Sequence, residues 1–364
     1  MTSDVQGADA FMFERNDGLT DEQKHTAEEW TYFDEDLAGI DPDVAAIILQ
    51  HRTNFAHNDL PRHAFKRDVP DDVVLYRDIP YMKDADAAHP SRGHLLDVIL
   101  PRDAVVRGGA SIPVIVEIHG GAFFYGFKEI NRAHAIVLAQ HGYAVVSVNY
   151  LLYPSVDFIE QLRELSAAIT WIREQGGRYL LDADQCFFTA DSAGVVLALH
   201  LVLAMHNAEY GDLIGVHPPK IGLLALGCKS SMASLDRLFD DQARDAGGLV
   251  EELAPFFSRY VRLVRGSRYE RLQQIVEAAS LPPAWLATST DDFLEATGLE
   301  LAAQLRDLNI DHQLLDYRAG SRQCLPHNFI VGMPWLKESR DAVESMIAFF
   351  TEHLTPRTSL VASE

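Results

Sequence analysis

The chain has 364 residues, of which 48% are hydrophobic, so it is long enough to bury a large core. Its 53 acidic residues outnumber its 31 Lys and Arg residues and give a formal net charge of −22. This excess of negative charge argues against nucleic acid or an anionic membrane as a partner, because both attract basic surfaces.

The N-terminal residues 1–72 are predicted to be helical. Asp41 and Pro42 form a helix start, because the aspartate can accept hydrogen bonds from the free N–H groups of the first turn and proline fits that turn. Val44, Ile47 and Ile48 then share one helical face. Because this segment precedes the first strand pattern, we expect it to form part of a cap.

From residue 73 onward, short apolar runs alternate with helical patterns. A polar stretch separates the first two runs, which predicts an antiparallel hairpin, and helical patterns separate most of the later ones. The sequence therefore predicts an α/β fold with a mainly parallel, eight-stranded sheet over 73–354, flanked by helices, and a frayed tail over 355–364. The predicted strands are 73–81, 94–100, 113–118, 143–148, 186–189, 221–226, 284–288 and 313–317.

Residues 230–280 contain no strand pattern. Phe256, Phe257, Tyr260 and Val264 follow helical spacing, and Pro255 must either kink this helix or mark its start. We predict a helical cap insertion at about 230–280.

The stretch 186–194 reads Cys-Phe-Phe-Thr-Ala-Asp-Ser-Ala-Gly. A β-prone run, a serine (Ser192) between small residues, and an apolar helical pattern have the layout of a nucleophile elbow. Ala190 stands where the G-x-S-x-G pattern has its first glycine, so on this motif alone a simple turn is the alternative.

The stretch 119–126 reads His-Gly-Gly-Ala-Phe-Phe-Tyr-Gly and follows a predicted buried strand. Glycines allow backbone N–H groups to point at a bound oxygen without a side chain in the way. The carboxyl end of a parallel strand is where α/β proteins bind ligands, which favours a binding loop over a simple glycine turn.

These two stretches resemble the H-G-G-G and Gly-Asp-Ser-Ala-Gly motifs of the hormone-sensitive-lipase-like esterases, an α/β-hydrolase family. Residues 145–150, Val-Val-Ser-Val-Asn-Tyr, resemble the strand of that family that ends in Asp-Tyr-Arg-Leu-Ala-Pro. The resemblance spans roughly residues 40–350. It implies that Ser192 is the nucleophile of an α/β-hydrolase with a helical cap. It also implies an oxyanion hole, in which the N–H donors are Gly121, Ala122 and Ala193 and the supporting residue is Gly120.

The acid is expected at Asp292. Pro282-Pro283-Ala284 leads to Asp292-Phe293-Leu294, which resembles the Asp-Pro-Leu-x-Asp that follows a Pro-Pro-Ala strand in the family. Neighbouring side chains at a strand end point to opposite sides, so only one of Asp291 and Asp292 can face a base. Asp291 and, more distantly, Glu295 remain alternatives.

The base is expected at His327. His327-Asn328-Phe329 resembles the His-Gly-Phe of the family and follows the acid in the chain order Ser, Asp, His. His312, which opens the last predicted strand, is the weaker alternative.

Several positions depart from the family. Ala122 and Ala190 replace glycines, and because an alanine at positive φ costs about 1 kcal/mol or more, we predict ordinary φ angles at both. Asn149 and Leu151 replace Asp and Arg, so a supporting salt bridge of the family should be absent or rebuilt.

We therefore predict a serine carboxylesterase that cleaves a small or short-acyl ester through an acyl-enzyme intermediate. Two alternatives remain: an acyltransferase or amidase that uses the same three residues, and a non-catalytic small-molecule receptor on the same fold. The predicted substrate pocket contains Phe123, Phe124, Tyr125 and Asp191.

No cofactor or metal is expected, since no His, Cys, Asp or Glu cluster has metal-ligand spacing. No run of 18 apolar residues predicts a membrane span, and the first residues lack the pattern of a secretion signal. The three scattered cysteines, Cys186, Cys228 and Cys324, are expected to be buried, reduced thiols in a cytoplasmic protein. The sequence does not decide whether the chain forms a homodimer.

Overall fold

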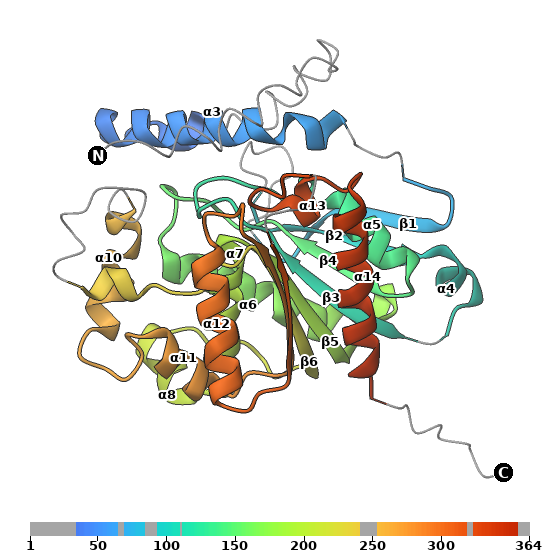
Figure 1. Cartoon of the computed structure of the whole chain (residues 1–364). Helices are drawn as coiled ribbons and strands as arrows, with labels where there is room; N and C mark the ends of the chain where they lie inside the picture. Colours follow the sequence, from blue (N-terminus) through green and yellow to red (C-terminus); the bar gives the residue numbers. More distant parts are fainter. Residues whose placement is uncertain are drawn as a thin grey trace.

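The computed structural model describes residues 34–64, 69–83, 93–109, 111–240, 253–318 and 323–355. Eight strands form one sheet in the order β1-β2-β4-β3-β5-β6-β7-β8 (Figure 1). β2 is antiparallel to both β1 and β4, and all the other neighbouring pairs are parallel. The predicted hairpin and mainly parallel sheet are thus confirmed. The strands are β1 (Val73–Pro80), β2 (Leu95–Pro101), β3 (Ile112–Ile118), β4 (Ala144–Val148), β5 (Leu181–Asp191), β6 (Leu223–Lys229), β7 (Ala284–Ser289) and β8 (His312–Tyr317).

Helices flank the sheet on both faces (Figure 1). The α-helices are α3 (Pro42–Ala64), α4 (Arg102–Arg107), α5 (Arg132–Gln140), α6 (Phe158–Gln175), α7 (Ala193–His206), α8 (Ala208–Ile214), α10 (Ala254–Val264), α11 (Leu272–Ala279), α12 (Glu295–Asp307), α13 (Phe329–Gly332) and α14 (Lys337–Glu352). The 3-10 turns are η2 (Asp34–Leu37), η3 (Gly176–Tyr179) and η4 (Asp236–Phe239).

The strands are apolar on both sides because each face carries its own core. Val114 and Val116 of β3 belong to a cluster that includes α6 and α7, whereas Ile115 belongs to a second cluster with α5 and α14. Successive strand residues point to opposite faces, so a strand covered on both sides reads as a continuous apolar run.

Strand β5 is longer than its apolar run predicts, because it begins at Leu181 rather than at Cys186. Its first residues pair with Ile112 and Pro113, and the register then shifts before Cys186. Asp182 and Asp184 lie in this first part and conceal it in the sequence, since their polar side chains interrupt the apolar pattern.

Helices begin at both places where the sequence indicated a start, Asp41-Pro42 and Pro255. Asp41 Oδ1 accepts hydrogen bonds from the N–H groups of Asp43 (3.0 Å) and Val44 (3.4 Å) at the start of α3. Pro255 lies in the first turn of α10, so it marks the start of that helix rather than a kink.

The assignment of residues 1–72 and 230–280 to a cap stays a prediction. Residues 1–33 and 241–252, and the tail beyond residue 355, lie outside the described residues. In Figure 1, α3 lies along the outside of the domain, apart from the sheet, and α10 lies beside α6.

Among the described helices, none is by itself long and apolar enough to cross a membrane. α7 and α8 together pass a test of length and composition, but they meet at 117° and α7 is buried in the core.

Cys186 and Cys228 are buried free thiols, as predicted, and Cys324 is half-buried. Burial raises the pKa of the Cys228 thiol to about 12.

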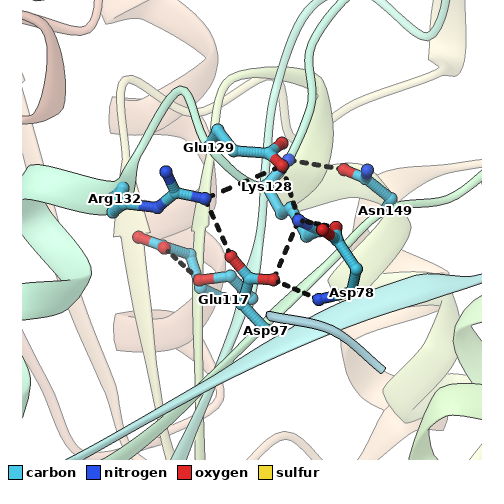
Figure 2. A network of polar contacts seen from close by, with 8 residues as sticks. Asp78, Asp97, Glu117, Lys128, Glu129, Arg132 and Asn149 are labelled. Atoms are coloured by element: carbon cyan, nitrogen blue, oxygen red, sulfur yellow. Dashed lines mark hydrogen bonds and ion pairs between the residues drawn. The ribbon is translucent and has the colours of Figure 1, made fainter. Parts of the chain in front are cut away.

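A buried charge network ties the segment after the glycine loop to β1 and β2 (Figure 2). Lys128 Nζ is fully buried and pairs with Asp78 (2.8 Å), Asp97 (2.8 Å) and Glu129 (2.5 Å). Arg132 adds a second cation, 3.0 Å from Asp97.

Asn149, which stands where the resembling family has Asp, accepts a hydrogen bond from the backbone N–H of Lys128. The contact at position 149 is therefore a neutral hydrogen bond, and the buried ion pairs lie at Lys128 and Arg132.

Removal of the Lys128 ammonium should be strongly destabilising. Lys128→Ala leaves buried carboxylates without their shared cation, and we expect the free energy of unfolding to fall by about 3–5 kcal/mol in urea denaturation. Lys337→Ala is the matched control, because the Lys337–Asp341 pair is exposed and its loss should cost less than about 1 kcal/mol. Equal losses in the two variants would contradict this account of the network.

Candidate active site

The predicted corner between β5 and α7 is present, with Ser192 at its apex. Ser192 has φ 52° and ψ −124°, and it is the residue that immediately precedes α7. A non-glycine residue in this region costs on the order of 1–3 kcal/mol and persists only where its surroundings hold it. The backbone N–H of Ser192 donates to the carbonyl of Lys229 (3.0 Å), which fixes the corner to β6.

The corner closes because Gly194 has no side chain. A Cβ at this position would lie 2.4 Å from the carbonyl oxygen of Ile118 and 2.7 Å from that of His119. Ala190, in contrast, lies in regular strand geometry between Ile118 and Cys228, and its φ is not positive, as predicted. The close approach of helix and sheet thus depends on the second glycine of the motif and not on the first.

The prediction of an ordinary φ at Ala122 is wrong. Gly121, Ala122 and Phe123 have φ values of 111°, 50° and 70°. The Gly121 carbonyl accepts hydrogen bonds from the N–H groups of Phe124 (3.3 Å) and Tyr125 (3.0 Å), so the loop turns sharply. Two hydrogen bonds to the Phe123 carbonyl fix the turn to neighbouring segments. The donors are Tyr153 N and Gln161 Nε2, both at 2.9 Å.

This loop lies directly against the serine. A Cβ at Gly120 would come within 2.8 Å of the Ser192 Cβ. Within the described part of the chain, no group accepts a hydrogen bond from the N–H groups of Gly121, Ala122 or Ala193. They are therefore available to a bound oxygen, and their oxyanion role remains a prediction.

Ser192, His327 and Asp292 form a continuous series of hydrogen bonds. His327 Nε2 lies 2.9 Å from Ser192 Oγ, and His327 Nδ1 lies 2.8 Å from Asp292 Oδ1. A carboxylate can only accept at Nδ1, which assigns the proton there and leaves the Nε2 lone pair facing the serine hydroxyl. The arrangement can therefore take a proton from Ser192.

The Asp292 carboxylate is held as an anion. Burial raises the pKa of Asp292, but the hydrogen bond and charge of His327 and the N–H of Leu294, 2.8 Å from Oδ1, outweigh burial, so the pKa is lowered. A buried anion beside the imidazole stabilises the imidazolium that forms when His327 takes up a proton.

The alternative acids and base lie elsewhere. Asp291 accepts a hydrogen bond from the N–H of Leu325 (2.9 Å), and Glu295 pairs with Arg318 (3.3 Å). His312 begins β8, at the end of the sheet opposite to Ser192, and its Nδ1 contacts the Ile310 carbonyl (2.9 Å).

Phe124, one of the four predicted pocket residues, lines a pocket, and the substrate role of all four stays a prediction. Phe123 is buried against Phe256 and Phe257, and the Tyr125 hydroxyl donates to Asp59 (2.8 Å). The pocket beside Phe124 lies under α3 and is lined also by Val44, Ile47, Ile48, His51, Tyr153 and Leu253.

Asp191 is buried behind the serine. It is 3% exposed, and its two carboxylate oxygens accept hydrogen bonds from Asn131, Gly120 and Asn328. Asp191 therefore belongs to the buried support of the site.

Two supporting residues were missed from the sequence. Ser230 Oγ accepts a hydrogen bond from the N–H of Asn328 (2.9 Å) and helps to lower the pKa of Asp292. Arg52 of α3 donates to the carbonyls of Phe124 (2.8 Å) and Tyr153 (3.1 Å) and pairs with Asp36.

A signal for Arg52 does exist in the sequence. Arg52 lies four residues after Ile48 and four before Ala56, so a charge interrupts the buried face of α3. A buried charge of this kind requires a partner.

Comparisons with known proteins agree with this fold. The family described as alpha/beta hydrolase fold matches residues 115–329. The chain is 30% identical to "Probable carboxylic ester hydrolase LipM" of Mycobacterium tuberculosis over 138 residues, which are 37% of this chain and only 31% of that protein.

Solved structures are similar over most of the chain. An inhibited esterase B from Lactobacillus rhamnosis has a TM-score of 0.72 and 25% identity, over 85% of this chain and 96% of that one. Another form of it is described as inhibited by a tributyrin phosphonate. A bacterial heroin esterase, at 19% identity and a TM-score of 0.63 over 87% and 98% of the two chains, shares the fold.

Gly194 of α7 and Gly298 of α12 give a matched test of the corner. Gly194→Ala should displace α7 from the carbonyls of Ile118 and His119, so we expect at least about a 100-fold loss of any reactivity at Ser192. Gly298→Ala should be neutral or stabilising by up to about 1 kcal/mol, because its Cβ would meet nothing closer than 3.7 Å. Thermal melts and Ser192 labelling of both variants measure this, and full reactivity of Gly194→Ala would refute the close contact.

Proposed function

The chain belongs to the hormone-sensitive-lipase-like esterase family of the α/β-hydrolase superfamily, and on this premise we propose that it is a serine carboxylesterase. Its substrate is a small or short-acyl ester, cleaved through an acyl-enzyme intermediate. The observation that carries the proposal is the continuous series of hydrogen bonds from Asp292 through His327 to Ser192.

In the first half of the reaction, His327 Nε2 takes the proton of Ser192 as Oγ attacks the ester carbonyl carbon. The carbonyl oxygen becomes an oxyanion, which accepts hydrogen bonds from the N–H groups of Gly121, Ala122 and Ala193. The tetrahedral intermediate then collapses, the bond to the alcohol oxygen breaks, and the imidazolium of His327 gives its proton to the departing alcohol.

In the second half, water replaces the alcohol. His327 removes a proton from the water as its oxygen attacks the acyl carbon, and the same N–H groups hold the second oxyanion. Collapse releases the carboxylic acid and returns the proton to Ser192 Oγ. Throughout, Asp292 holds the imidazole in the tautomer that faces the serine and stabilises its positive charge.

The substrate class rests on the surroundings of the loop. Phe124 and apolar side chains of α3 line a pocket beside it, although Ser192, Asp292 and His327 are not among the residues that line this pocket. The form of esterase B with a tributyrin phosphonate supports a short acyl chain by similarity. We also propose that α3 and the 230–280 segment cover the site, with Arg52 as the tie between α3 and the oxyanion loop.

Labelling tests the assignment of the nucleophile. A fluorophosphonate should form one adduct, on the peptide that contains Ser192, and p-nitrophenyl acetate should give a burst followed by turnover. Mass spectrometry of the treated protein locates the adduct. An adduct on another serine, or none on active protein, would overturn the proposal.

Substitution of the partners tests their roles. Ser192→Ala and His327→Ala should lower kcat more than about 1,000-fold, and Asp292→Asn should lower it about 100- to 10,000-fold. Asp291→Asn is the matched control, because its amide oxygen can still accept from the Leu325 N–H, and its kcat should stay within about threefold of the original. If Asp291→Asn were the damaging change, the acid would have to be reassigned.

A further inference from the structure

The Asp191 carboxylate is a buried junction between three segments of the site. Its Oδ2 accepts hydrogen bonds from the backbone N–H of Gly120 (3.2 Å) and from Asn328 Nδ2 (3.0 Å). Its Oδ1 accepts from Asn131 Nδ2 (2.8 Å), and the Asn131 amide oxygen in turn accepts from Arg62 of α3 (2.6 Å). Asp191 Oδ1 is thus fixed through Asn131 to α3, and Oδ2 joins the oxyanion loop to the loop that carries His327.

Asn328 is the residue immediately after His327, and it is held twice. It has φ 60° and ψ 23°, its N–H donates to Ser230 Oγ (2.9 Å), and its side chain donates to Asp191. The resembling family has glycine here, which takes this conformation at least as readily as asparagine. Glycine could make the backbone contact to Ser230 but not the contact to Asp191.

The asparagine is also a costly choice for the fold. Asn328 Oδ1 is buried and has no hydrogen-bond partner among the described residues. A buried acceptor without a partner is destabilising, so conformational preference and polar satisfaction both favour glycine at this position. The contribution of the side chain must therefore come from its contact with Asp191.

We propose that the hydrogen bond from Asn328 to Asp191 is a positioning contact, which holds His327 at hydrogen-bond distance from Ser192. Asp191 precedes the serine and Asn328 follows the histidine, so this bond joins the two segments on either side of the Nε2 to Oγ contact. The inference rests on the proposed esterase function, since His327 must reach Ser192 for the proton transfer.

The test replaces Asn328 by the residue that keeps its backbone conformation. Asn328→Gly should lower kcat for p-nitrophenyl acetate by roughly 10- to 100-fold, with KM within about threefold, because a small misplacement of a reacting group has effects of this size. The rate of fluorophosphonate labelling at Ser192 should fall in parallel, while Tm changes by no more than a few degrees.

Asn309→Gly is the matched control. Asn309 also has a positive φ, 55°, but it is exposed and follows α12, away from the site. This variant should retain the original kcat, KM and labelling rate.

A change of charge at position 328 gives the second arm. Asn328→Asp places a second carboxylate beside Asp191 and should lower kcat further than Asn328→Gly does. The Asp191 side is left unchanged, because its carboxylate also accepts from Gly120 and Asn131 and no other side chain would keep all three contacts.

Two results would overturn the positioning role: the original kcat in Asn328→Gly, or the original kcat in Asn328→Asp. Failure of the esterase proposal itself would be recognised separately, because the unmodified chain would then show neither ester turnover nor labelling of Ser192.

Discussion

The site depends on one close contact, the approach of the start of α7 to the end of β3. Gly194 allows this approach, because any side chain there would collide with the carbonyl oxygens of Ile118 and His119. Once helix and strand are this close, Ser192 is forced to a positive φ at the apex, and the glycine loop after β3 lies against it. The strain at this corner is local, and the buried strands on either side resist its relaxation.

Buried polar groups hold the loops around this corner. Lys128 and Arg132 tie the segment after the glycine loop to β1 and β2 (Figure 2). Asp191 joins the loop to the residue after the histidine. Ion pairs of this kind contribute little net stability, since desolvation offsets their attraction, but they are costly to break one side at a time. They therefore suit parts of the chain that need one fixed arrangement, and Arg52 extends the same principle to α3.

The sequence predicted the sheet, its order of elements and the three residues that form the continuous series of hydrogen bonds, because each left a local pattern. Apolar runs marked the strands. The resemblance to Asp-Pro-Leu-x-Asp favoured Asp292 over Asp291, and chain order with strand context favoured His327 over His312. The pattern failed where tertiary contacts override local preference. Ala122 takes a positive φ despite its Cβ, because Phe123 behind it is held by Tyr153 and Gln161.

A second kind of residue left no local pattern to read. Asn328 contacts Ser230 across 98 positions of sequence and Asp191 across 137, and no local periodicity reports such contacts. The most direct test of the proposed oxyanion hole is a crystal structure of the chain with a phosphonate bound to Ser192. The account predicts the phosphonyl oxygen at about 2.7–3.2 Å from the backbone nitrogens of Gly121, Ala122 and Ala193. A phosphonyl oxygen that points away from these three N–H groups would contradict it.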